Sequence, residues 1–260
     1  MQTLSALSNL SIEEKQFISR LEDRLDRVEQ RYQEEITDFL EPRMQLVAES
    51  YLRSVKFQRY LFCGGYETAE RKRLVLFPEY TEPDCAMAGI RLFRFQGKLD
   101  YVSVTHRDFL GAIMGLGLRR EKFGDLLVRE TGFDLYVQEE IADYLLQNEI
   151  RVKHVPLEPK ELSLSDFEPP EQNIKELHIM VASMRLDTLL AHGLNLSRTK
   201  AMELIQSGRV KVNHSEVTDN DYLCRQDDLI SCRGKGRLRI GETSGETKKG
   251  KLKVCILKYI

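Results

Sequence analysis

The sequence predicts an α+β protein with more than one domain, and three observations lead to that prediction. Apolar residues recur at helical spacing near the N-terminus, an alternating order of strands and helices runs through the middle, and a basic segment of helices and strands closes the chain. The 260 residues exceed the roughly 100–200 of one typical domain. With 42% apolar and 31% charged residues, the chain has enough apolar material for real hydrophobic cores.

Composition also excludes several classes of protein. The longest charge-free apolar run is Phe109–Leu118, about half of the roughly 20 residues that a membrane-spanning helix needs, so no membrane insertion is expected. Residues Met1–Leu10 lack the basic and apolar regions of a signal peptide. The five cysteines are scattered without a Cys-x-x-Cys motif, which predicts neither a disulfide framework nor a zinc knuckle. We therefore expect a cytoplasmic protein with no metal and no cofactor.

The first predicted element is an amphipathic helix over Ser11–Leu40. Its apolar residues are three or four positions apart: Phe17, Leu21, Leu25, Val28, Tyr32, Ile36 and Phe39. Ser11 and Glu14 have the spacing of a capping box. Pro42 ends the pattern, and a second helix with a fuller apolar stripe is expected from Met44 to Val55. This pair is interpreted either as a helical hairpin packed on its own body or as a surface that binds a protein partner through Ser11–Leu40.

The pattern changes to short strands after residue 57. Strands are expected at Leu61–Phe62, Leu74–Phe77 and Ile90–Phe95, with irregular chain over Glu82–Ala88 and a turn at Gly97. Residues 1–80 are therefore assigned to an N-terminal helical and mixed region.

Residues 81–156 are assigned to a ferredoxin-like α-β plait, because the order β-α-β-β-α-β is typical of that fold. Thr105 and Asp108 mark the start of its first helix. The expected strands and helices are, in order, Tyr101–Val104, Phe109–Leu116, Asp125–Arg129, Phe133–Val137, Glu139–Gln147 and Val152–Val155.

A linker is predicted over residues 157–179, after which the charge changes sign. Four of the seven prolines lie at or near this segment, among acidic residues and serines: Pro156, Pro159, Pro169 and Pro170. From Met184 to Ile260 the chain has 15 Lys+Arg against 9 Asp+Glu, whereas the remainder has 24 against 32. A basic C-terminal unit on an acidic body is typical of a nucleic-acid-binding module.

The C-terminal unit, residues 180–260, is expected to present a phosphate-reading surface. Ser197 is a suitable N-cap for a helix whose first turn contains Arg198 and Lys200, and helix N-termini attract phosphate. In the following strand Val210 and Val212 share the inward face, which leaves the alternate residues outward. The expected RNA-binding residues are Arg185, Ser197, Arg198, Lys200, Arg209, Lys211, Asn213, Arg233, Lys235 and Arg237.

Motifs in this unit resemble the S-four-type RNA-binding domain, also called the alpha-L motif. They are Arg185-Leu186-Asp187, Leu196-Ser197-Arg198, Leu204-Ile205-x-x-Gly208-x-Val210-x-Val212-Asn213 and Asp228-x-Ile230. The chain departs from the family pattern at Asp227, where glycine is usual, and at Lys200, where a capping-box carboxylate would stand. The resemblance implies binding of structured RNA, with Asp187 fixing local structure.

Further motifs are similar to the bacterial YlmH family and extend the resemblance over nearly all of residues 40–260. They are Phe62-Cys63-Gly64-Gly65-Tyr66-Glu67, Thr105-His106-Arg107-Asp108-Phe109-Leu110-Gly111-Ala112, Lys122-Phe123-Gly124-Asp125 and Arg233-Gly234-x-Gly236-Arg237. This resemblance implies a non-enzymatic factor that binds ribosomal RNA on the large ribosomal subunit, together with peptidyl-tRNA, during quality control of stalled translation.

A second basic RNA surface is considered for the N-terminal two thirds of the chain, with solvated loops as the alternative. Its members are Arg71, Lys72, Arg73, His106, Arg107, Arg119, Arg120 and Lys122. Because the plait also resembles RNA-recognition folds, Phe133 is either a base-stacking residue or part of the core.

Two other functions stay open. Arg185-Leu186-Asp187 echoes a motif of pseudouridine synthases, which would fit an RNA-modifying enzyme, although the catalytic domain of those enzymes has no counterpart here. A scaffold for cell division or photosystem assembly would use the helix Ser11–Leu40. A kinase is excluded, because His106-Arg107-Asp108 occurs without a glycine-rich loop or Asp-Phe-Gly.

Overall fold

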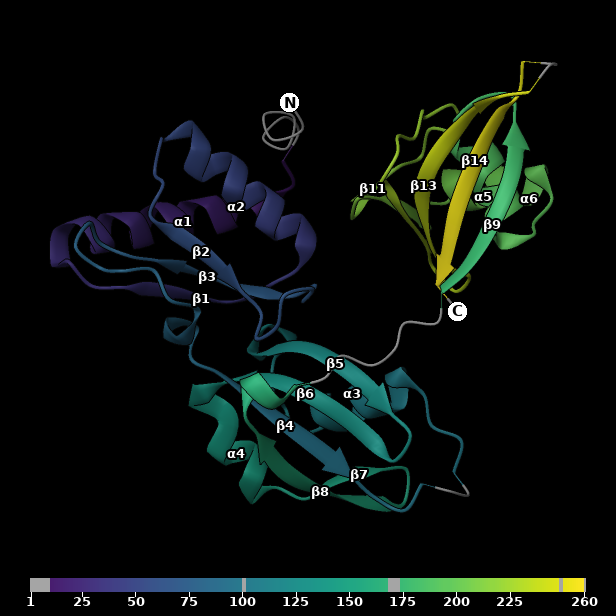
Figure 1. The fold of residues 1–260 in the computed structure, drawn as a ribbon. Coiled ribbons are helices and arrows are strands. Elements are labelled where there is room, and N and C mark those ends of the chain that lie inside the picture. The colour runs from purple at the N-terminus through teal and green to yellow at the C-terminus, as the bar shows by residue number, and fades with distance from the viewer. Residues whose placement is uncertain (1–9, 100–101, 168–173, 248–249, 260) are drawn as a thin grey trace. The chain divides into compact units, whose positions relative to one another are not determined.

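The computed structural model describes residues 10–99, 102–167, 174–247 and 250–259. The chain divides into two compact units, residues 1–170 and 171–260. Within the described residues, the first unit holds a three-stranded and a five-stranded sheet, and the second holds a six-stranded sheet (Figure 1). Helices accompany each sheet. The predicted α+β class is confirmed.

The first helix is shorter than its periodicity predicts. Helix α1 (Ile12–Arg31) begins at the expected capping box, in which Ser11 and Glu14 bond each other's backbone. It ends at Tyr32, whose φ of 54° is left-handed. Residues Glu35–Leu40 form strand β1 instead, so the predicted helix Ser11–Leu40 is wrong in its last third. A bulge between Ile36 and Phe39 gives that strand a spacing that imitates one helical turn.

The apolar seam of α1 faces its own unit. Helix α2 (Pro42–Ser54) and strands β2 (Tyr60–Cys63) and β3 (Lys72–Leu76) complete this region, with strand order β1-β3-β2. Figure 1 shows α1 and α2 together on one face of the sheet. Four seam residues are buried in the core between them: Phe17, Leu21, Leu25 and Val28. The interpretation that this seam packs on its own body is therefore right, although strand β1 separates the two helices, so they do not form a simple hairpin. The four buried residues are not available to a protein partner.

Two of the cysteines are paired, which the sequence does not predict. Cys63 at the end of β2 and Cys85 in a 3₁₀ turn (Cys85–Ala88) form a disulfide, with 5.5 Å between their Cα atoms. The chain brings them together because Gly64 and Gly65 end the strand and the chain returns through β3 to the same side.

The central sheet has the ferredoxin-like arrangement. Its elements are β4 (Ile90–Gln96), α3 (His106–Met114), β5 (Phe123–Arg129), β6 (Gly132–Gln138), α4 (Ala142–Gln147), β7 (Ile150–Val152) and β8 (Val155–Leu162). All pairings are antiparallel in the order β5-β6-β4-β8-β7. Thr105 and Asp108 form the predicted capping box of α3. Figure 1 shows the helices beside this sheet.

Two strands of the plait differ from the prediction. The first strand is β4, because residues 102–104 are irregular and Tyr101 lies outside the described residues. The expected last strand, Val152–Val155, is the turn of a hairpin, with Lys153 in a left-handed conformation. Strand β8 beyond it takes the fourth place in the sheet despite its two prolines.

The two faces of the plait sheet are both covered. Phe133 is fully buried on the helix side and stacks on Phe95, so it is a core residue and not a base-stacking platform. On the opposite face Tyr136 is also fully buried, beneath Tyr66 of the N-terminal region and Phe167 after β8. The sheet surface on which RNA-recognition folds stack bases is closed at this position.

The C-terminal unit is a six-stranded sheet with two helices. Its elements are β9 (Ile174–Val181), α5 (Leu186–Leu194), α6 (Arg198–Gln206), β10 (Val210–Val212), β11 (Ser215–Glu216), β12 (Leu229–Cys232), β13 (Gly236–Glu246) and β14 (Leu252–Tyr259), in the strand order β11-β10-β12-β13-β14-β9. Leu189, Ile205 and Val210 belong to one core between sheet and helices. The predicted linker, residues 157–179, is thus largely β8 and β9.

None of the helices among the described residues is long and apolar enough to cross a membrane.

Candidate nucleic-acid interface

A buried carboxylate holds two arginines at the start of α5. Asp187 is fully buried and accepts hydrogen bonds from Arg185 Nε and Nη2 at 3.1 and 2.9 Å. Arg198, the first residue of α6, donates to the same carboxylate from Nε and Nη2 at 3.0 and 2.9 Å. The Arg198 side chain is 62% exposed. The contact therefore orients a guanidinium that is still accessible to a phosphate.

The charge of Asp187 is secured by these bonds. Burial by itself raises the pKa of this carboxyl, but hydrogen bonds from Arg185, Arg198 and Thr188 outweigh burial and lower the pKa to about 2. Asp187 is therefore ionised throughout the physiological range. Arg185 also pairs with the exposed carboxylate of Asp221, so the two guanidinium groups of this cluster are balanced by two carboxylates.

The start of α6 has the cap that the sequence predicts. Ser197 Oγ accepts a hydrogen bond from the Lys200 backbone N–H at 3.2 Å. The Lys200 ammonium lies 2.6 Å from a carboxylate oxygen of Glu203, and both side chains are more than half exposed. An exposed pair of this kind is worth little in water, so Lys200 can exchange Glu203 for a phosphate.

The other basic residues gather where the short strands begin and turn. The Arg233 backbone N–H donates to the Arg209 carbonyl at 2.9 Å, which places these two exposed residues side by side. Lys211 and Arg237 each pair with Ser231, on either side of β12. Lys235 lies in the β12–β13 turn. Arg209 follows the C-terminal end of α6, whose nine residues span about 14 Å at 1.5 Å per residue, so the predicted surface consists of two groups.

Asn213 does not belong to that surface. With His214 it forms a tight hairpin turn in which both residues have left-handed φ values, 48° and 65°. Its amide nitrogen donates to Asp228 at 2.7 Å, and its amide oxygen accepts from the Leu229 backbone N–H at 2.9 Å. The side chain is therefore used to tie the turn to β12. Strand alternation alone missed this, because residue 213 already lies beyond the end of β10.

Asp227, where the chain departs from the family pattern, has a backbone conformation that favours glycine. Asp227 has a φ of 67°, a left-handed conformation that glycine adopts without steric cost. Its backbone N–H still donates to the Ile240 carbonyl at 2.8 Å. The turn that glycine usually makes is preserved with an aspartate.

Arg71, predicted for the second basic surface, lies inside the first unit. Its guanidinium Nε donates to the Phe123 carbonyl at 3.0 Å, and its backbone N–H donates to Asp125 at 3.0 Å. The residue is 7% exposed. Asp125 also accepts a hydrogen bond from the Tyr66 hydroxyl at 2.7 Å, a structural role that its motif does not predict.

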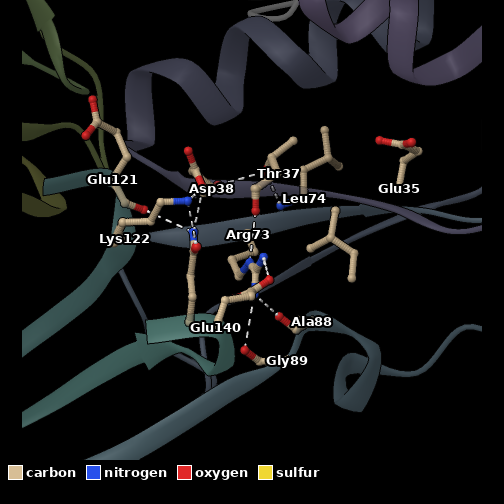
Figure 2. A network of polar contacts seen from close by, with 12 residues as sticks. Glu35, Thr37, Asp38, Arg73, Leu74, Ala88, Gly89, Glu121, Lys122 and Glu140 are labelled. Carbon is tan, nitrogen blue, oxygen red and sulfur yellow. Dashed lines mark hydrogen bonds and ion pairs between the residues drawn. The ribbon is translucent and has the colours of Figure 1, made fainter. Parts of the chain in front are cut away.

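Arg73 is equally internal. Figure 2 shows its guanidinium between β1 and the turn before β4, where it donates to the carbonyls of Thr37 at 2.9 Å and Ala88 at 2.6 Å. Glu140 approaches the same group at 3.3 Å. Both buried arginines thus join the N-terminal region to the plait, and the structure removes them from the proposed RNA surface.

The basic residues of the loop before β5 are only partly available to bind RNA. Lys122 Nζ contacts Asp38 at 2.7 Å and Gln138 at 3.1 Å (Figure 2). Arg120 donates to the carbonyls of Phe123 and Gly124, and burial, followed by the neighbouring Arg71, lowers its pKa to about 10. The exposed members of the second surface are His106, Arg107 and Arg119, and Lys72 is half-buried.

Three family models match successive parts of the chain. Residues 13–81 match "YlmH, N-terminal", residues 83–166 match "Putative RNA-binding domain in YlmH", and residues 184–230 match "S4 domain". The last of these contains the Asp187 cluster and, of the second basic group, Arg209 and Lys211.

Comparison with individual proteins gives the same picture. The chain is 36% identical over 227 residues to ribosome-associated protein quality control protein P2 of Bacillus subtilis, covering 87% of this chain and 88% of that protein. A cell division protein, ylmH of Streptococcus pneumoniae, has a similar fold, with a TM-score of 0.52 and 21% identity over 61% of this chain and 96% of its own. An uncharacterized RNA pseudouridine synthase of Mycoplasma genitalium is 40% identical over 57 residues, 22% of this chain and 18% of that protein.

Proposed function

This chain belongs to the YlmH family, and from that premise we propose that it binds structured ribosomal RNA on the large ribosomal subunit as a non-enzymatic factor in quality control of stalled translation. Peptidyl-tRNA on the same subunit is the second expected RNA partner, and the cytoplasm is the expected location. Its relative in Bacillus subtilis is named for ribosome-associated quality control.

One observation carries the proposal at the level of residues. The buried Asp187 carboxylate fixes Arg185 and Arg198 at the starts of two helices, in the segment that matches the S4 domain. Phosphate is bound best by a guanidinium that is held in place in advance, because less side-chain entropy is then lost on binding. Helix N-termini add partial positive charge at the same position.

The mode of recognition follows from what surrounds this cluster. The basic residues predicted for this surface are arginines and lysines on helix ends, strands and turns, and apart from the half-buried Arg185 they are exposed. Such groups contact phosphates and read the shape of a folded RNA. We expect binding that depends on RNA shape and weakens steeply with salt.

The central plait is expected to contribute in a different way. Tyr66 and Phe167 cover Tyr136 on its sheet, so stacking of bases there is not part of the proposal. We expect this part to contact only the phosphate backbone of the RNA. The residues exposed for such contacts are His106 and Arg107 at the start of α3, and Arg119.

The proposal is tested with the full chain and purified large subunits. Co-sedimentation at low salt, lost at high salt, is expected for the unmodified protein. Arg198→Ala and Arg209→Ala should each weaken binding by about tenfold, the effect of one charge-assisted hydrogen bond. Arg151→Ala is the matched control, because Arg151 is an exposed arginine that pairs with Glu149 in the other unit. Unchanged affinity in both C-terminal variants would remove the proposed surface.

Two rival functions predict different experimental results for the same purified protein. Turnover of a labelled RNA by the purified chain would favour an RNA-modifying enzyme, since the similarity to a pseudouridine synthase covers a fifth of each chain. A complex that resists RNase would favour a protein scaffold, although the seam of α1 is buried within its own unit.

A further inference from the structure

Three side chains with metal-binding chemistry meet on the outer face of the C-terminal sheet. His178 of β9 and Cys255 of β14 are direct cross-strand partners. Glu176 lies two residues before His178 and therefore on the same face. The neighbours of Cys255 along its strand, Val254 and Ile256, point the other way into the core. This face is separate from the Asp187 cluster and plays no part in the proposed RNA contacts.

Their donor atoms are close enough to share one ion. The Glu176 carboxylate, the His178 imidazole and the Cys255 sulfur lie within 4.8 Å of one another. In a tetrahedral zinc site, bonds of about 2.0–2.3 Å separate the ligand atoms by roughly 3.5 Å. Small rotations of the two exposed side chains, Glu176 and His178, close that difference. Within the described part of the chain, none of the three makes a hydrogen bond or ion pair that would have to be broken.

A bulge in the adjacent strand adds space and negative charge. Gly241 and Glu242 of β13 together oppose Cys255, because the pairing skips from Ile240 to Thr243. A Cβ atom at Gly241 would lie 3.4 Å from the Cys255 sulfur, so the missing side chain keeps the thiol accessible. The carboxylates of Glu176 and Glu242 act electrostatically on the Cys255 thiol, so a divalent cation bound beside the sulfur would be attracted by both.

We propose that Glu176, His178 and Cys255 form a zinc site with a water molecule in the fourth position. Thiolate, imidazole and carboxylate together suit Zn²⁺, whereas Mg²⁺ and Ca²⁺ require oxygen ligands. The sequence does not reveal the site because its ligands come from the first and last strands of the unit and no motif joins them. The bound ion would connect these two strands.

The test is a metal titration of the full chain, purified without metal. Co²⁺ is used as the probe, because a cysteine thiolate gives it a charge-transfer absorption band and a tetrahedral site gives it intense visible bands. We expect binding of one equivalent and displacement by Zn²⁺. Cys255→Ser should remove the charge-transfer band. His178→Ala and Glu176→Gln should each weaken binding by at least about tenfold, which is the lower bound for loss of even an outer-shell partner.

The matched control is His192→Ala, because His192 is an exposed histidine on α5 in the same unit. It should bind Co²⁺ as the unmodified chain does. A charge-transfer band that persists in Cys255→Ser, or equal affinities of His178→Ala and His192→Ala, would overturn the proposal. So would failure to bind an equivalent of either ion. Thermal unfolding without metal verifies that each variant is folded. Because Glu176 is exposed, Glu176→Gln should fold and still test the site even if Cys255→Ser is unstable.

Discussion

At the scale of single residues, Asp187 connects the stability of the C-terminal unit to the geometry of the candidate RNA site. It is a fully buried carboxylate whose bonds to Arg185 and Arg198 compensate for its burial. Removing the charge leaves Arg198 without the carboxylate that orients it, whereas Arg185 keeps its contact with the exposed Asp221. Stability and RNA binding are therefore coupled at Asp187, and also at Arg198, because two of the hydrogen bonds to this buried carboxylate come from Arg198.

Asp187→Asn is expected to lower the free energy of unfolding of the C-terminal unit by about 3 kcal/mol, the cost of breaking a buried ion pair. The folded pKa of about 2 lies below the ordinary value of 3.8. The contribution of the carboxylate is therefore complete above about pH 5 and is lost as the pH falls through the folded pKa of about 2. Denaturant titrations of both proteins across this range should converge at the acid end.

The control for that substitution is Asp221→Asn, because Asp221 pairs with the same Arg185 but is 70% exposed. It should change stability by less than about 1 kcal/mol. Equal effects of the two substitutions would show that burial of Asp187 is not what matters.

A second residue-scale prediction concerns Asp227. Its left-handed backbone is strained for any residue with a Cβ atom. Asp227→Gly should therefore raise the free energy of unfolding by about 0.5–1 kcal/mol, measured by chemical denaturation. A lower stability would mean that the greater freedom of glycine in the unfolded chain outweighs the relief of strain.

At the scale of elements, patterns were reliable where one face of a helix is buried and its start is capped. The capping boxes at Ser11 and Thr105 and the cap at Ser197 all occur as predicted. Strand β1 was mistaken for helix because its bulge spaces Ile36 and Phe39 by three residues. Local spacing cannot reveal a bulge, which depends on the partner strand.

The candidate site also contains residues whose positions follow from local sequence and residues whose positions depend on distant segments. Arg198 and Lys200 were identified from a helix start, which is local. The internal positions of Arg71 and Arg73 depend on carbonyls from β1 and other distant segments, which no local pattern contains. Local patterns therefore locate candidate basic residues, but they do not predict which of them face solvent.

Gly132→Ala is the element-scale prediction. A Cβ atom at this start of β6 would lie 1.8 Å from the Phe95 carbonyl oxygen of β4. The strands would have to separate, and we expect a loss of about 3 kcal/mol in stability of the first unit. Gly111→Ala is the control, because nothing lies within 4 Å of the added atom on helix α3, and it should be neutral or stabilising by up to about 1 kcal/mol. Similar melting temperatures for both variants would contradict this account.

At the scale of the whole molecule, the two units have separate cores. Unfolding is therefore expected as two calorimetric transitions. Gly132→Ala should lower one of them and Asp187→Asn the other. A single transition that shifts equally with either substitution would mean that the units unfold together.

RNA binding by the whole molecule should follow counterion release. A plot of log K against log salt concentration should be linear, and removing one phosphate contact should make its slope shallower by about 1. Arg209→Ala and Lys211→Ala are expected to do so, whereas Arg151→Ala should leave the slope unchanged. Filter binding at several salt concentrations gives the slopes.

The pairing of β9 with β14 has a consequence for how this unit is connected to a chain. Ile174 and Tyr259, near its two ends, are register partners. The polypeptide thus enters and leaves the domain at one point, as in folds that accept circular permutation or insertion into a host loop. Joining these ends and opening the turn between β12 and β13 should give a permuted domain with the same sheet. Its adjacent ends give the unit the geometry of a domain that can be inserted into another chain.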